Sequence, residues 1–194
     1  MRVLSMISVA LLASACIAEK PAPVAAPKAP APSLAAPVAP VGPSLAVPAP
    51  PAKATKIDFT IPLQPIKQKD LSFSMLKNRW SLLFYFSPTC GHCMHTFPAI
   101  REIRTKYEKK GLAVAAIATG TASPEDIATF DSELKLDVMA FQDVTKKFSQ
   151  EYGTGSVPLI LLVSPDASFK MWNSSDSATQ VEINKSIRSA LKLK

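Results

Sequence analysis

The chain has 194 residues, a formal net charge of +7 and 18 prolines, eleven of which lie between Pro21 and Pro51. Residues 57–194 carry only +3 of that charge, and their Lys and Arg residues are scattered, which argues against a nucleic-acid-binding face. The uneven proline content predicts one globular part and one segment that cannot pack a hydrophobic core.

The first residues predict an export signal. Arg2 provides a minimal positive end, and the apolar run that follows it, residues 3–12, is too short to cross a bilayer. The small residues Ala13-Ser14-Ala15 come next, a pattern that is typical of a signal-peptide cleavage site. We therefore expect residues 1–15 to form a signal peptide that is removed on export.

The next residue, Cys16, indicates a second kind of processing. Ala13-Ser14-Ala15-Cys16 resembles a bacterial lipobox, in which the cysteine is lipidated and becomes the new N-terminus. Cys16 is the one cysteine outside a later Cys-x-x-Cys pair, and it stands where a lipobox needs it; ordinary cleavage after Ala15 is the alternative. Because Ile17 rather than Asp follows, the resemblance implies an anchor in the outer membrane, with the protein in the bacterial periplasm.

Residues 16–56 consist mainly of Ala, Pro and Val with isolated lysines. Frequent prolines remove backbone donors and fix φ, which blocks both helix and sheet. We expect a disordered tether with polyproline II character, which at about 3.1 Å per residue would span on the order of 100 Å. A proline-rich ligand for another protein is the alternative interpretation.

The globular domain is expected to cover residues 57–194. The alternating sequence Ile57-Asp58-Phe59-Thr60-Ile61 predicts a short edge strand that Pro62 would end. Residues 80–86 are almost all apolar, which predicts a strand buried on both faces. After a break at residues 87–89, the apolar side chains recur at three- and four-residue steps, which predicts a helix from the first cysteine to Tyr107.

Cys90 and Cys93 stand at Cys-x-x-Cys spacing where this helix begins. Free backbone amides and the positive end of the helix dipole favour a thiolate at Cys90, and a second thiol one turn away allows thiol–disulfide exchange. A charged imidazole at His92 would stabilise that thiolate further. We therefore predict Cys90 as the nucleophile, Cys93 as the resolving thiol and His92 as the residue that tunes them.

The rest of the chain alternates strands and helices. Apolar runs predict strands at residues 112–118, 138–141, 157–163 and 169–172. Capping residues predict further helices that begin at Ser123, Asp143 and Ser177. This order of elements predicts an α/β fold with a central mixed β-sheet flanked by helices.

From about residue 57 the chain resembles the thioredoxin-fold thiol–disulfide oxidoreductases, in particular the TlpA/ResA-like branch. Cys90-Gly91-His92-Cys93 is similar to the active-site turn, Pro98 matches the proline that kinks the next helix, and Gly155-Ser156-Val157-Pro158 resembles the cis-proline loop. The 64 residues between Cys93 and Pro158 exceed the spacing in thioredoxin. The resemblance thus implies a thioredoxin-like fold with a helix–strand unit inserted between the Cys-x-x-Cys helix and the cis-proline loop.

The resemblance also implies roles for the residues around the cysteines. Pro158, if its peptide bond is cis, would shape the groove that holds the substrate backbone, and Val157 and Gly91 would contact the substrate. The partners would be thiol- or disulfide-containing exported proteins and a membrane redox donor or acceptor. We expect no cofactor.

The direction of electron flow stays open at this point. The family resemblance implies a reductase, whereas the Gly91-His92 dipeptide matches protein disulfide isomerases, whose potential is roughly −180 mV against roughly −270 mV for thioredoxin. The buried acid of thioredoxin is Phe84 here, and the Glu of ResA-like proteins is Thr96. Neither carboxylate is therefore available to take the proton from Cys93.

A binding module is the alternative from a different class. A zinc site needs four ligands, and residues 57–194 contain no cysteine besides Cys90 and Cys93. His92 and His95 lie on the same helical turn as the two thiols, so the four groups cannot surround a metal tetrahedrally. We expect no metal site, and His95 is interpreted as a surface residue; a copper or partner carrier without turnover remains the rival interpretation.

Overall fold

The computed structural model describes residues 54–173 and 176–193, which belong to one compact unit of the chain. The expected signal peptide 1–15, the lipidation residue Cys16 and nearly all of the expected tether 16–56 lie outside the described residues.

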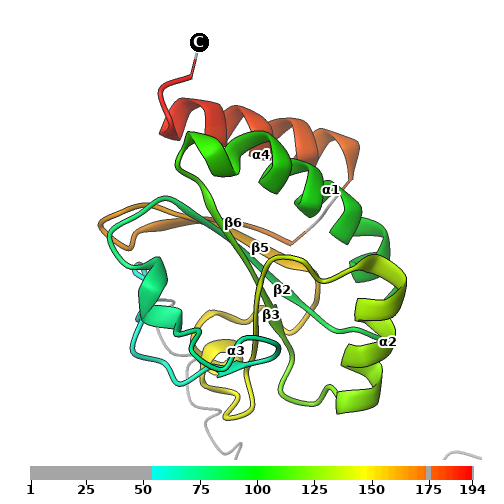
Figure 1. The fold of residues 1–194 in the computed structure, drawn as a ribbon. Helices are drawn as coiled ribbons and strands as arrows, with labels where there is room; N and C mark the ends of the chain where they lie inside the picture. Colours follow the sequence, from blue (N-terminus) through cyan, green and yellow to red (C-terminus); the bar gives the residue numbers. More distant parts are fainter. Residues whose placement is uncertain (1–53, 174–175, 194) are drawn as a thin grey trace, which may run out of the picture. The chain divides into compact units, whose positions relative to one another are not determined.

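A mixed β-sheet forms the centre of the described part. Its strands are β1 (Gln64–Pro65), β2 (Ser81–Phe86), β3 (Ala113–Ala118), β4 (Met139–Gln142), β5 (Leu159–Val163) and β6 (Phe169–Trp172). Within the described residues these six strands lie in the order β1-β4-β3-β2-β5-β6 (Figure 1). The central strands β2, β3 and β4 are parallel, whereas β1 pairs antiparallel with β4, and β5 pairs antiparallel with β2 and β6.

The two central strands are buried along their whole length, as their continuous apolar runs predict. They differ in side-chain size, because β2 carries large side chains and β3 is mostly alanine, and Phe84 pairs with Ala116 in the register. Small residues beside the rings of β2 leave room for a helix to pack closely on the sheet.

Helices cover both faces of the sheet. They are α1 (Gly91–Tyr107), α2 (Pro124–Leu134), α3 (Lys147–Tyr152) and α4 (Ser177–Ala190). Buried residues of α1, α2 and α4 form one hydrophobic cluster with one face of the sheet, and α1 and α4 run side by side (Figure 1). Residues 57–76 and α3 contribute to a second cluster on the other face. The predicted mixed α/β architecture is thereby confirmed.

The chain between α1 and the loop before β5 contains two strand–helix units, β3–α2 and β4–α3. α2 followed by β4 is a helix–strand unit in the place where the long spacing between Cys93 and Pro158 predicts one. Because β4 lies beside β3 in the sheet, this unit widens the sheet on the side away from β5.

The predicted edge strand at residues 57–61 is wrong. Ile57, Phe59 and Ile61 are buried as the alternation requires, but the segment packs on the sheet without pairing as a strand. The carboxylate of Asp58 accepts hydrogen bonds from the backbone N–H and the hydroxyl of Thr60, at 2.8 and 2.7 Å, and so turns the chain locally. The edge strand forms instead at β1, three residues further on.

Of the three predicted helix starts, only the one at Ser123 is confirmed, since α3 begins at Lys147 after the N-cap Lys146 and not at Asp143. Ser123 and Asp126 form the expected capping box of α2. The carboxylate of Asp143 accepts from the first amides of α3, Phe148 N and Ser149 N, at 3.1 and 2.9 Å. The predicted capping box at Ser177 is wrong, because Asp176 is the N-cap of α4 and accepts from Thr179 N at 2.8 Å. A charged carboxylate complements the helix dipole better than a hydroxyl.

Candidate active site

Cys90 is the N-cap residue of α1, at the carboxyl end of the central strand β2. The turn between the two elements is closed by a hydrogen bond from Cys90 N to the Ser87 carbonyl at 3.2 Å. The N-cap makes no side-chain capping bond, and the thiol is partly exposed. First-turn amides and the positive end of the dipole of α1 therefore lie next to an accessible sulfur.

Cys93 lies one turn further along α1 in a different environment. Its side chain is fully buried and belongs to the same cluster as Phe84, Phe86 and Phe97. Burial raises the pKa of the Cys93 thiol to about 12; a hydrogen bond to the backbone of Ser87 opposes the rise, and the Cys90 side chain adds to it. The two cysteines are thus chemically unequal, since one is accessible and the other is held as a neutral thiol.

The loop before β5 reaches the first cysteine from a distant part of the sequence. The Val157–Pro158 peptide bond is cis, and the Val157 carbonyl oxygen lies 4.0 Å from the Cys90 Sγ, across 67 residues of sequence. Pro158 is buried, while Val157 is partly buried and packs against both hydrophobic clusters. The structure therefore brings Cys90, Cys93, Val157 and Pro158 together.

The two residues between the cysteines are exposed on the first turn of α1. A Cβ atom placed on Gly91 would meet nothing within 4 Å, so close packing does not require glycine there. His92 and His95 are both exposed, three residues apart on the helix. Both are therefore accessible to solvent, and His92 is the one that directly neighbours Cys93 in the chain.

The two positions where related folds carry a carboxylate hold an apolar and a neutral residue here. Phe84 stacks on Phe86 with ring centroids 5.4 Å apart. Thr96 is buried, and its hydroxyl donates to the His92 carbonyl at 2.6 Å. The surroundings of Cys93 are therefore apolar on the side of the sheet.

Sequence reasoning missed the contribution of the loops beside Cys90. The Ser87 backbone contacts the Cys93 thiol, and no side-chain pattern reports such a contact. Gln142 at the end of β4 donates to the carbonyls of Thr119 and Ala122, at 3.4 and 2.8 Å, and holds the loop that follows β3. Because β2, β3 and β4 are parallel, their carboxyl ends and these loops lie at one edge of the sheet.

Neither a metal cluster nor a membrane-spanning helix occurs in the part of the chain that the structure describes. Residues 54–173 and 176–193 contain no group of three or more His, Cys, Asp and Glu side chains placed to hold a metal ion. In the same residues, no helix is both long and apolar enough to cross a bilayer.

Three comparisons relate this arrangement to known proteins. A thioredoxin-like protein of Haemophilus influenzae is 26% identical over 105 residues, which cover 54% of this chain and 60% of the relative, so the chain spans less than two thirds of that relative. A thiol:disulfide interchange protein DsbE of Chlorobium tepidum superposes with a TM-score of 0.65 at 19% identity, over 72% of this chain and 99% of the other. A secreted disulfide oxidoreductase of Mycobacterium tuberculosis, homologous to E. coli DsbE, superposes with a TM-score of 0.56 at 16% identity. The match covers 66% of this chain and 93% of the other.

At these identities the two structural likenesses establish the fold, which is thioredoxin-like, with a mixed sheet flanked by helices. The family is established by the sequence itself, because residues 51–171, well over half of the chain, match the AhpC/TSA family. The chain therefore belongs to the AhpC/TSA family.

Proposed function

We propose that this protein is an exported thiol–disulfide oxidoreductase of the TlpA/ResA-like branch, which exchanges disulfides with other exported proteins through Cys90 and Cys93. The observation that carries this function is the unequal environment of the two sulfur atoms. Cys90 is accessible at the N-terminus of α1, and Cys93 is fully buried with its pKa raised to about 12. An accessible nucleophile beside a buried resolving thiol is the arrangement that stepwise exchange requires.

The exchange has two steps. In the reducing direction the Cys90 thiolate attacks one sulfur of a partner disulfide, which forms a mixed disulfide and releases the other partner sulfur as a thiolate. Cys93 then gives up its proton and attacks the Cys90 sulfur, which releases the partner's second thiolate and leaves a Cys90–Cys93 disulfide. The oxidising direction is the reverse sequence. Once Cys90 is in the mixed disulfide its charge is gone, so its contribution to the raised pKa of Cys93 is removed.

The residues around the sulfurs have supporting roles in this function. An extended substrate backbone would bind beside Cys90 against Val157 and Pro158, whose peptide bond is cis and whose Val157 carbonyl lies 4.0 Å from the Cys90 Sγ, and Gly91 would contact it from α1. His92, exposed on the first turn, favours the thiolate of Cys90 when its imidazole is charged.

Export and tethering complete the proposed function. Residues 1–15 act as the signal peptide, Cys16 is lipidated and anchored in the outer membrane, residues 16–56 form the tether, and residues 57–194 form the catalytic domain in the periplasm. A membrane redox donor or acceptor resets the Cys90–Cys93 pair. Support for an extracytoplasmic location comes from the signal sequence and from the secreted M. tuberculosis protein of the same fold.

Trapping of mixed disulfides tests the assignment of the two cysteines. Cys93→Ser leaves the nucleophile without its resolving partner, so this variant should accumulate mixed disulfides with envelope proteins on non-reducing gels. Cys90→Ser should accumulate few, because the remaining thiol is buried. Equal trapping by both variants would overturn Cys90 as the nucleophile.

Turnover separates the enzyme from a carrier on the same fold. We expect the purified chain to reduce insulin or to refold scrambled ribonuclease, and the reduction potential of the pair, measured in glutathione or dithiothreitol buffers, to set the physiological direction. Stoichiometric binding of copper together with neither activity would favour the carrier.

A further inference from the structure

A groove of about 660 Å³ lies on the surface where α1 and α4 pack against each other. The side of α4 that lines it is a single helical stripe, because the lining residues recur at three- and four-residue steps: Ser177, Gln180, Val181, Asn184, Lys185 and Arg188. On the α1 side, the groove is lined by residues of the last two turns. It is therefore built by two secondary-structure elements and not by a mobile loop.

The floor of this groove is polar and fixed. Tyr107 is only 1% exposed, and its hydroxyl donates to the side-chain oxygen of Asn184 at 3.1 Å. The amide nitrogen of Asn184 in turn donates to the Gln180 carbonyl at 3.0 Å. Both ends of the Asn184 amide are thus engaged, and the Tyr107–Asn184 bond ties the two helices together beneath the groove.

Positive charge gathers at the walls. Lys106 from α1 and Lys185 and Arg188 from α4 line the groove together with one acid, Glu102, which leaves an excess of two positive charges. Within residues 54–173 and 176–193, neither Lys106 nor Arg188 forms an ion pair with an acid. A further lysine, Lys110, lies close by, with its Nζ 5.5 Å from the ring centroid of Tyr107.

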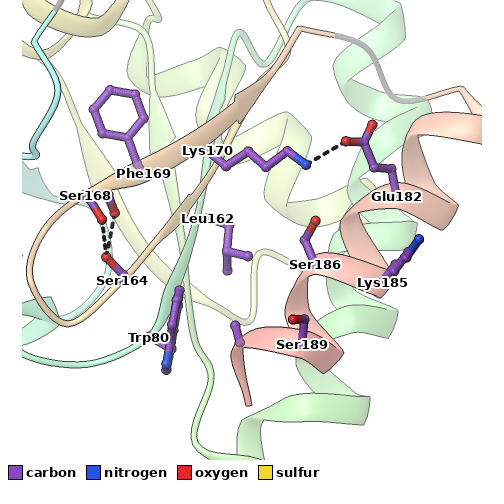
Figure 2. Close-up of a pocket in the computed structure, with 11 residues that line it drawn as sticks. Trp80, Leu162, Ser164, Ser168, Phe169, Lys170, Glu182, Lys185, Ser186 and Ser189 are labelled. Carbon is purple, nitrogen blue, oxygen red and sulfur yellow. Dashed lines mark hydrogen bonds and ion pairs between the residues drawn. The ribbon is translucent and has the colours of Figure 1, made fainter. Parts of the chain in front are cut away.

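The opposite side of α4 provides a contrast. Another groove, of about 590 Å³, lies between α4 and the β5–β6 hairpin (Figure 2). There Lys170 Nζ and the Glu182 carboxylate are 2.7 Å apart, so the cation and the acid that face each other are already paired (Figure 2). Lys185 lines both grooves, so the excess of positive charge is one in this groove and two in the α1–α4 groove, where Lys106 and Arg188 add theirs.

The charged groove also exposes an apolar side chain. Val181 is 69% exposed in the middle of the α4 stripe, and it is one of three large hydrophobic residues exposed in the described part of the chain. A binding partner that covers Val181 would remove apolar surface from water. The ligand should therefore combine negative charge with an apolar group.

We propose that the groove between α1 and α4 is a docking site for an acidic peptide segment of a partner protein. Carboxylates of the segment would contact Lys106, Lys185 and Arg188, and one of its apolar side chains would cover Val181. The groove is concave, which suits an extended peptide better than the flat surface of a bilayer. Pockets for small molecules are mostly apolar, which this groove is not.

The groove lies apart from the redox cysteines on the same helix. Cys90 is the N-cap of α1, and Lys106 lies sixteen residues after it, near the other end of the helix. At 1.5 Å per residue this spacing corresponds to about 24 Å along the helix axis. A peptide in the groove would therefore leave the thiol of Cys90 free. The site adds a contact for a partner beyond the disulfide exchange itself.

Binding of a defined probe to the full-length purified chain tests this site. The probe is a fluorescein-labelled peptide of Glu-Glu-Leu repeats, followed by fluorescence anisotropy at low and physiological salt. We expect saturable binding that weakens with salt, and a Lys106→Gln, Lys185→Gln, Arg188→Gln variant that binds about tenfold more weakly. The same peptide with Gln in place of Glu should not bind measurably.

A matched variant controls for net charge. Lys77→Gln, Lys146→Gln, Lys147→Gln removes three exposed lysines that lie outside the groove, and it should bind the probe as the wild type does. Val181→Glu is a second groove variant. The fold should tolerate it because the Val181 side chain is highly exposed. It should weaken binding of the probe through charge repulsion and through loss of the apolar contact. Circular dichroism and thermal unfolding verify that each variant is folded.

Four results would overturn the docking site. They are equal loss of binding in the control variant, unchanged binding in both groove variants, equal binding of the Gln peptide, and absence of binding by the wild type. Vesicles of phosphatidylglycerol provide the remaining comparison. The contrary outcome is that the vesicles bind the wild type but not the triple groove variant, while the peptide binds neither of these two proteins. In that case the groove recognises a membrane surface and the peptide assignment is wrong.

Discussion

Cys90 and Cys93 differ because of where each falls on the helix that carries them. The buried side of α1 follows three- and four-residue steps through Phe97, Ile100, Ile103 and Tyr107, and Cys93 is the first member of that series. Cys90 precedes the series as the N-cap, where amides are free and the side chain is partly exposed. A spacing of three residues thus gives one accessible sulfur and one buried sulfur.

The proposed role of His92 predicts a change in reduction potential. Replacing His92 with Pro removes an imidazole that, when charged, would stabilise the Cys90 thiolate, so the reduced form should lose stabilisation and the couple should become more reducing. The expected shift is on the order of tens of millivolts, since about 30 mV corresponds to a factor of ten for two electrons. The potential is measured by equilibration with glutathione buffers.

Two further variants separate charge from backbone effects. His92→Gln removes the charge without introducing a proline, and it should shift the potential in the same direction as His92→Pro. His95→Gln removes an equally exposed imidazole one turn further from the N-terminus, and it should leave the potential unchanged. A more oxidising His92→Pro variant, or an equal shift in the His95 variant, would refute the role of His92.

At the scale of elements, the loops that follow β3 and β4 approach each other closely beside the active site. Asp143 N donates to the Ala118 carbonyl at 3.0 Å, and its carboxylate caps α3. A Cβ atom on Gly120 would lie 2.2 Å from the Asp143 carbonyl oxygen, a distance that no real contact reaches. Glycine at position 120 therefore allows both loops to occupy the same edge of the sheet.

Gly120→Ala should destabilise the fold by about 1–3 kcal/mol, because the clashing atom is backbone and cannot move aside as a side chain can. Urea unfolding measures the effect. Gly91→Ala is the matched control, since its Cβ would meet nothing within 4 Å on a helical residue, and it should leave stability unchanged or raise it slightly. Equal stability of the two variants would contradict the close approach of the loops.

At the scale of the whole molecule, the proposed function places a periplasmic domain on a long tether. This part of the proposal rests on the sequence, in which prolines between Pro21 and Pro51 favour a tether over a packed core and a lipobox-like sequence ends at Cys16. A tether of this kind would let one anchored domain reach partners well away from the membrane surface.

Cys16→Ser should release the protein from the membrane fraction into the soluble periplasmic fraction, because the residue proposed to carry the lipid is lost. Cell fractionation followed by immunoblotting measures the change, and Cys90→Ser serves as a control that should stay in the membrane fraction. A wild-type protein that is already soluble after export would refute lipidation and identify Ala15 as an ordinary cleavage site.

The parts of this protein that could be predicted from the sequence are those that depend on residues close together in the chain. The buried strands β2 and β3, the start of α2 at Ser123 and the position of Cys90 at a helix N-terminus all follow from local periodicity and capping. Three local predictions were wrong. Residues 57–61 bury the expected side chains without forming a strand, α3 begins at Lys147 rather than at Asp143, and Asp176 rather than Ser177 caps α4.

The tertiary structure alone decided which distant segments meet. It places the Val157 carbonyl 4.0 Å from Cys90, the hydroxyl of Tyr107 on Asn184 and the loop at Gly120 against Asp143. Periodicity reports which side of an element is buried, but it does not report the order of strands, their register or the neighbour that covers each face. Contacts between distant segments therefore determine which residues join the two cysteines in the candidate site. They also form the whole of the groove between α1 and α4.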